Sequence, residues 1–283
     1  MTLELDVRPR GLYSLALTAR FASDATRRFS EGRLDALLPE PASASQLPDG
    51  TVRLRAESEA GLQRLRFVLA LDDDHSELVR RFGDDPMLGP SLRRFRGMRV
   101  LRVPTVAQSL LRALCGQLVT SREARALERR ILRATMPRGP GGLCVPPTRE
   151  ALGALSPLRL RTLGLAERRA AALVRVCRGL DLERLRDVPT EAAATRLERE
   201  RTLGPWSAGV VCLQGLGRSE RGLVGDLGLV KLLRELRGRP VEGWETQELL
   251  EPYGEWAGLA SVYLLAGMGA GLVPGAPARR HAA

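Results

Sequence analysis

Short stretches in the first quarter of the chain alternate between apolar and polar residues. The alternation runs over residues 3–7, 52–56 and 65–71. Successive side chains of a strand point to opposite faces of a sheet, so this pattern is typical of half-buried antiparallel strands. The stretch 39–50 is rich in Pro, Ser and Ala and is predicted to be a loop. Residues 1–72 are therefore predicted to form a small β-rich domain.

From about residue 73 the apolar residues recur three or four positions apart, which is the period of a helix. This spacing predicts one helix over residues 106–118 and a second over residues 121–134. Thr105 and Gln108 have the residue types and spacing of a capping box at the start of the first helix. The second part of the chain is thus expected to be helical.

Glycine and proline divide the rest of the sequence. The stretch 137–147 contains several of both and is predicted to be a linker, and the run after it is broken into short helices. We therefore predict an α+β protein, in which an all-α domain over residues 73–270 follows the β-rich domain. Residues 271–283 are mostly Pro, Gly and Ala, and are expected to be a disordered tail without a function of its own.

Length and charge narrow the classes of function. A chain of 283 residues is long enough for two modest hydrophobic cores. The net charge of +11 favours a polyanionic partner, and nucleic acid is the commonest one. Lys231 is the only lysine, so a genomic preference for arginine codons explains the choice of basic residue. This codon preference does not explain why basic residues outnumber acidic residues.

Several kinds of site have little support in the sequence. The four cysteines are far apart and form no CxxC pair, which argues against zinc and iron–sulfur centres. His75 and His281 are the only histidines, which argues against a histidine-centred metal site and against a Ser–His–Asp triad. We therefore expect no metal and no cofactor. The N-terminus has no apolar signal core and no stretch has membrane-spanning length, so a cytoplasmic protein is expected.

Three segments in the C-terminal half carry the candidate chemistry. Residues 203–206 place a glycine turn before a helix start, where unpaired N–H groups can bind a phosphate. Taken alone, this short turn is more readily explained as an ordinary corner between packed helices. Asp226 opens an apolar helical run, either as a simple N-cap or as a carboxylate that the helix dipole keeps ionised. Trp256 lies near the start of a late helix, where a core position is the default.

These segments, in this order, resemble the helix–hairpin–helix DNA glycosylase superfamily and, within it, the AlkA-type 3-methyladenine DNA glycosylase II branch. The likeness is firm from about residue 105 to residue 265, and the family's N-terminal antiparallel β domain agrees with the alternation described above. Five segments carry it: 202–208 with the hairpin and helix start, 213–217, 226–229 with the aspartate, 113–119 with the helix-end motif, and 163–170 with a mid-domain turn.

The resemblance implies roles for individual residues. It places Asp226 as the catalytic aspartate, which stabilises positive charge on the sugar and directs the attacking water. It implies that Trp206 and Trp256 line the base pocket with Gln117 beside them. Leu118 corresponds to the wedge that fills the gap left by a flipped nucleotide, although a helix core position is the alternative.

The hairpin and pocket depart from the family pattern at three positions. The resemblance implies that a DNA phosphate is bound by the hairpin residues Thr202, Leu203, Gly204 and Pro205. Thr202 stands where the family hairpin has its first glycine, and a threonine disfavours a strongly positive φ, so we expect a distorted hairpin or a weaker grip. Val210 and Leu227 stand where AlkA-type enzymes carry aromatic residues, so we expect a less aromatic pocket.

The lysine content predicts which reaction is catalysed. Bifunctional members of the superfamily form a Schiff base with a lysine at the position that Trp206 occupies here, and Lys231 lies five residues beyond Asp226. We therefore predict a monofunctional glycosylase in base excision repair, which acts as a monomer on double-stranded DNA and removes alkylated purines such as 3-methyladenine. The alternatives are a glycosylase for oxidised or deaminated bases and a non-catalytic, damage-sensing DNA-binding protein. An Arg-rich RNA-binding protein would need interleaved exposed aromatics, which the sequence lacks.

Overall fold

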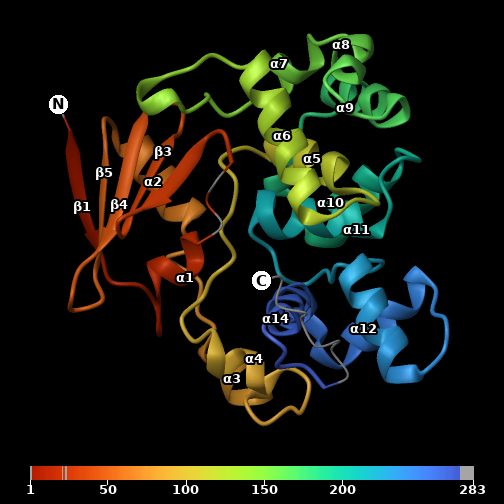
Figure 1. Cartoon of the computed structure of the whole chain (residues 1–283). Helices are drawn as coiled ribbons and strands as arrows, with labels where there is room; N and C mark the ends of the chain where they lie inside the picture. The colour runs from red at the N-terminus through yellow and green to blue at the C-terminus, as the bar shows by residue number, and fades with distance from the viewer. Residues whose placement is uncertain (1, 21, 23, 275–283) are drawn as a thin grey trace, which may run out of the picture.

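The computed structural model of the protein describes residues 2–20, 22 and 24–274. Figure 1 shows a β-sheet on one side of the molecule and the helices gathered beside and below it. The five strands pair in the order β1-β5-β4-β3-β2, and every neighbouring pair is antiparallel. Their bounds are β1 Leu3–Val7, β2 Arg27–Ser30, β3 Arg33–Leu37, β4 Pro41–Gln46 and β5 Val52–Ala56.

Many short helices follow the sheet, so the predicted α+β class is confirmed. They are α1 Leu15–Ala19, α2 Glu59–Val68, α3 Ser76–Phe82, α4 Gly89–Arg94, α5 Val106–Gly116, α6 Ser121–Thr135, α7 Arg149–Gly153, α8 Pro157–Thr162, α9 Glu167–Gly179, α10 Thr190–Glu198, α11 Pro205–Val210, α12 Leu227–Arg237, α13 Thr246–Leu250 and α14 Ala257–Gly269. A π-helical turn, Val211–Leu216, extends α11. Within the described ranges, the helices are too short or too polar to span a lipid bilayer.

Two predictions about the β-rich part are wrong. Residues 65–71, expected as a strand, form the end of α2 and the turn after it. Leu62, Leu65 and Leu69 are buried and three and four positions apart, so the helical period of the core face prevails over the alternation. The expected loop over residues 39–50 contains β4, which pairs with β3 and β5 although its Ala and Ser residues give no strand signal in the sequence.

The two predicted central helices are confirmed, with one shift in their ends. The first, α5, ends at Gly116, so the segment that follows it leaves the helical path. Thr105 caps it by accepting a hydrogen bond from the Gln108 N–H, but a complete capping box lies at the start of α6, between Thr120 and Glu123. Helix α5 contacts α6, α9, α11 and the π-helical turn, and is therefore the centre of the helical part.

The hydrophobic core is divided into two clusters. One lies between the sheet and α2, and its last member is Leu71; the other fills the helical part and, apart from Ala25, begins at Leu78. The proposed domain border at residues 72 and 73 falls between them.

Two further segments differ from their predictions. The expected linker 137–147 folds back, and its Cys144 N–H donates to the Ala25 carbonyl beside the sheet. The tail prediction is wrong for residues 271–274, because Val273 is buried in the helical core. Residues 275–283 of the predicted tail lie outside the described residues.

A buried ion network joins the sheet to the helices. Asp24, just before β2, accepts from Arg27 at 3.0 Å and from Arg112 of α5 at 2.7 Å, and Arg112 also reaches Glu128 of α6 at 2.9 Å. Burial alone would raise the pKa of the Asp24 carboxyl, but the two guanidinium groups lower it well below its usual range. The carboxylates of Asp24 and Glu128 are thus paired with arginines inside the protein, where an unpaired charge would be costly.

Candidate active site

Asp226 is held by two neutral hydrogen-bond donors. It is the N-cap of α12, and its Oδ1 accepts from the Gly228 N–H at 2.8 Å. Its Oδ2 accepts from the Trp206 indole Nε1–H at 2.9 Å. The fold thus brings together two predicted site residues that are 20 positions apart. The carboxylate has a fixed direction in a half-buried position.

Within residues 2–20, 22 and 24–274, no cation pairs with this carboxylate. Among the ion pairs of the described residues, none involves Asp226. Neutral N–H donors orient a carboxylate without cancelling its charge, whereas an arginine would do both. Asp226 can therefore stabilise a positive charge that develops next to it, which is the electrostatic requirement of a reaction through a cationic intermediate.

A glycine at the end of α5 makes room for the Trp206 indole. A Cβ at Gly116 would lie only 2.7 Å from Cη2 of Trp206, which is closer than real Cβ contacts allow. The indole is half-buried, lies over Gly116 and points its N–H at Asp226. Its ring position therefore depends on the absence of a side chain at residue 116.

The turn after α5 carries two predicted site residues, Gln117 and Leu118. The first forms hydrogen bonds to the hairpin, and the second is exposed. The Gln117 amide nitrogen donates to the Thr202 carbonyl at 2.7 Å and to Ser207 Oγ at 2.9 Å, so it ties this turn to the hairpin. Leu118 is 79% exposed and has a φ of +55°. The helix-core alternative for Leu118 is therefore wrong. An apolar side chain held in water by a left-handed backbone is the geometry that a wedge needs.

The predicted hairpin lies between α10 and α11. The residues at positive φ include none from 199 to 205, so Thr202 fits without strain and the family's glycine is not required for this turn. Its N–H points to the Glu200 carboxylate at 3.4 Å, and the Leu203 N–H donates to the Glu200 carbonyl at 2.8 Å. Gly204 is the N-cap of α11 and offers no capping side chain, so the first N–H groups of that helix lack an acceptor from the cap.

Trp256, Val210 and Leu227, the other predicted pocket positions, differ in their burial. Trp256 is half-buried and packs against the helical core, and its Nε1 is buried without a hydrogen-bond partner in the described part of the chain. Val210 is buried, whereas Leu227 is 51% exposed and directly follows Asp226. The pocket role of Trp256 stays a prediction, because no described contact joins it to Asp226.

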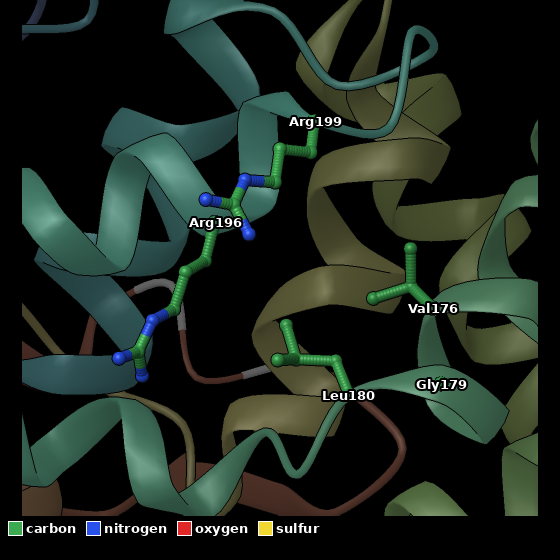
Figure 2. Close-up of a pocket in the computed structure, with 5 residues that line it drawn as sticks. All are labelled: Val176, Gly179, Leu180, Arg196 and Arg199. Atoms are coloured by element: carbon green, nitrogen blue, oxygen red, sulfur yellow. The ribbon is translucent and has the colours of Figure 1, made fainter.

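A cationic hollow lies beside the hairpin rather than at Asp226. It has a volume of about 350 Å³ and lies between the end of α9 and the end of α10. Figure 2 shows the Arg196 and Arg199 side chains on one side of it and Val176 and Leu180 on the other. None of the predicted site residues lines it. Arg199 immediately follows α10, so the hollow adds positive potential next to the hairpin.

A second connection, which no sequence pattern marks, reaches the residue before Asp226. The Thr246 hydroxyl accepts from the Gly225 N–H at 2.8 Å, and the nearby Trp244 is 65% exposed. Neither residue follows a pattern that marks a site. Their relation to Asp226 depends on a contact between residues 21 positions apart, which only the fold reveals.

No family model matches the chain. Among curated relatives, the DNA-3-methyladenine glycosylase of Bacillus subtilis is 25% identical over 205 residues, which are 69% of this chain and 67% of that protein. A probable bifunctional transcriptional activator and DNA repair enzyme AlkA of Mycobacterium tuberculosis is 27% identical over 215 residues. That match covers 68% of this chain but only 43% of the mycobacterial protein.

Solved structures match over nearly the whole length. A 3-methyladenine DNA glycosylase from Archaeoglobus fulgidus has a TM-score of 0.80 at 21% identity, covering 93% of this chain and 97% of that one. The 8-oxoguanine glycosylase/lyase of Clostridium acetobutylicum, solved with double-stranded DNA, also has a TM-score of 0.80, at 18% identity, covering 96% and 99%. The fold is that of the helix–hairpin–helix DNA glycosylases. At these identities the structural likeness establishes the fold and leaves the damaged base open.

The resemblance predicted from the sequence is therefore confirmed. The Bacillus relative and the two solved structures are named as DNA glycosylases, and the mycobacterial relative is named as a DNA repair enzyme, which together support a DNA glycosylase in base excision repair. They differ in the base that they remove and in whether a lyase step follows. The damaged base and the presence of a lyase step must therefore be inferred from the residues of this chain.

Proposed function

We propose that this protein is a monofunctional DNA glycosylase that flips an alkylated purine out of duplex DNA and hydrolyses its N-glycosidic bond. The observation that carries the proposal is the Asp226 carboxylate, which Trp206 and Gly228 orient without neutralising it. Its charge remains available to a sugar that becomes cationic as the base departs.

The reaction needs little besides this carboxylate. As the bond between the base and C1′ lengthens, its electron pair leaves with the base and positive charge builds on the sugar ring, where Asp226 stabilises it. Water then adds to C1′ and gives up a proton toward the carboxylate. A base such as 3-methyladenine is already cationic and leaves as a neutral molecule, so no general acid is required.

The indole at residue 206 favours hydrolysis over strand cleavage. Schiff-base formation needs an amine at this position, and the indole Nε1 that is present donates its hydrogen to Asp226. Lys231 is exposed on α12 and makes none of the described side-chain contacts. An indole face attracts a cationic base by about 0.5–2 kcal/mol relative to a neutral one, which favours alkylated substrates.

The approach to DNA would use three elements around Asp226. Leu118 would enter the stack in place of the flipped nucleotide, because it is exposed and held outward. The hairpin residues 202–205 would bind a backbone phosphate through the uncapped N–H groups at the start of α11. Gln117 would keep both elements in register, since its amide bonds to the hairpin.

Base release from defined duplexes tests the proposal. We expect release of 3-methyladenine and 7-methylguanine, and no release by the D226N variant under the same conditions. Release of 8-oxoguanine or hypoxanthine alone would favour the alternative substrate class, whose fold neighbour is the clostridial 8-oxoguanine enzyme. A covalent enzyme–DNA adduct trapped by borohydride would overturn the monofunctional mechanism.

A further inference from the structure

Trp244 is the most exposed of the three indoles. It lies in the 3-10 turn Gly243–Glu245 and is 65% exposed, whereas Trp206 and Trp256 are half-buried. Burial of a ring of this size removes more apolar surface from water than burial of a smaller side chain, so an exposed indole offers a large contact surface to a partner.

A single hydroxyl joins the turn of Trp244 to the loop of Asp226. Thr246 Oγ1 accepts from the Gly225 N–H at 2.8 Å and donates to the Gly243 carbonyl at 2.7 Å. The two glycines approach closely, because a Cβ on Gly243 would lie 3.4 Å from the Gly225 Cα. Each glycine directly precedes one of the residues of interest, Asp226 and Trp244. The exposed indole is therefore positioned at the rim of the candidate active site.

A buried carboxylate fixes the shape of this turn. Glu245 is 5% exposed, and it accepts from Arg239 at 2.6 Å, from the Glu242 N–H at 2.7 Å and from Arg237. The hydrogen bonds from Arg239 and Glu242 lower the pKa of Glu245 to about 2, so this clamp stays ionised at neutral pH. The backbone at Trp244 is thus held in a fixed turn, so little backbone entropy would be lost when its exposed side chain binds a partner.

We propose that Trp244 contacts the damaged DNA strand beside the flipped nucleotide, where its indole packs against the sugar–phosphate backbone next to Asp226. The proposal rests on the proposed function. Leu227 and Trp244 are large exposed apolar residues on the two segments that meet at Gly225 and Gly243, and the chain carries a net charge of +11. An apolar rim around an anion in a cationic protein fits a nucleic acid strand, whose sugars pack on aromatic rings while its phosphates meet basic groups.

Binding to an abasic-site duplex tests the contact without requiring turnover. The probe is a duplex with a tetrahydrofuran residue, which cannot be hydrolysed. We expect W244A to raise the Kd for this duplex about tenfold relative to the wild type. The matched control is L12A, which removes a side chain that is 56% exposed on the N-terminal part. Both variants should keep the wild-type melting temperature, since neither side chain belongs to a core cluster.

Equal Kd values for W244A and L12A would overturn the proposal. So would a wild-type protein that does not bind the duplex at all. A protein that binds the duplex but releases no base would instead overturn the proposed function, and the Trp244 contact would still be measured.

Fluorescence quenching gives a second readout. Free wild-type protein should show an acrylamide-accessible tryptophan component that W244F lacks, because the other two indoles are half-buried. Duplex binding should protect that component. Its persistence in the complex would contradict the contact.

Discussion

Asp24 and Asp226 are both carboxylates with fixed hydrogen-bond partners, but their surroundings differ in one respect. Asp24 accepts from two guanidinium groups and from both the hydroxyl and the N–H of Thr26. Asp226 accepts from an indole N–H and a backbone N–H, with no cation in the described ion pairs. The first is fully buried and neutralised, and the second is half-buried and keeps its charge.

The difference separates two uses of the same chemical group. A carboxylate surrounded by arginines joins elements of the fold, and its loss leaves buried cations without partners. A carboxylate oriented by neutral donors contributes little to the fold, but it can respond to a charge that arises during a reaction. Substitutions around Asp226 are therefore expected to lower activity more than stability. Substitutions in the ion network of Asp24 are expected to lower stability more than activity.

The largest expected effect is on the activity of D226N. We expect the single-turnover rate of base release to fall about 10³-fold, because the charge facing the sugar is lost. Stability should fall by about 1–2 kcal/mol, because the single oxygen of asparagine still caps α12 but its amide nitrogen cannot accept from the Trp206 N–H. Duplex affinity should stay within a fewfold of the wild type. A variant that releases base at the wild-type rate would remove Asp226 from the mechanism.

The converse substitution is R112M in the ion network. It leaves Asp24 and Glu128 buried with fewer partners, so we expect the free energy of unfolding to fall by about 3–5 kcal/mol in urea titrations. Below the melting transition, base release should stay within a fewfold of the wild type. The control is R53M, which breaks the exposed pair with Asp6 and should cost about 1 kcal/mol or less. Equal losses in both variants would contradict a structural role for the network.

The W206F variant tests how the neutral donor contributes. It keeps an aromatic ring over Gly116 but removes the N–H that Asp226 accepts. A hydrogen bond to a charged group contributes about 1.5–3 kcal/mol, so we expect the single-turnover rate to fall by about 10- to 150-fold. Affinity for undamaged duplex should not change. A wild-type rate would mean that the cap of α12 alone is enough to orient the carboxylate.

The smallest effect is expected in the stability of L118G. A leucine at a φ of +55° is strained, so glycine should leave the free energy of unfolding unchanged or higher by about 0.5 kcal/mol. The rate of base release should nevertheless fall, because the wedge is gone. As a control, L158G removes another exposed leucine, 60% exposed, from α8 and should cost about 1 kcal/mol. A stability loss in L118G as large as that of L158G would mean that the turn is not strained.

The sequence predicted the parts of the site that lie within one motif. Asp226, Leu118 and the hairpin each lie in a turn next to a helix end. Their order along the chain carries the resemblance to the glycosylase superfamily. The bond between Trp206 and Asp226 was not predictable, because residue spacing does not say which atoms meet. Trp244 and Thr246 were missed for the same reason.

The errors in the fold have a related cause. Alternation in residues 65–71 was taken for a strand because local pattern alone does not show which face of a segment meets the core. Strand β4 was missed because Ala and Ser carry little strand preference, and their neighbours in the sheet, not their own propensity, hold them in place.

The contact between Gly116 and the Trp206 ring also constrains how this chain can change over evolutionary time. A lineage that replaced the indole with a lysine would leave empty space over Gly116, and one that gained a side chain at residue 116 would first displace the indole from Asp226. Single substitutions at either position therefore carry a penalty that a paired change avoids. Descendants that keep tryptophan at 206 are expected to keep glycine at 116, and a switch between hydrolysis and strand cleavage is expected to alter both positions together.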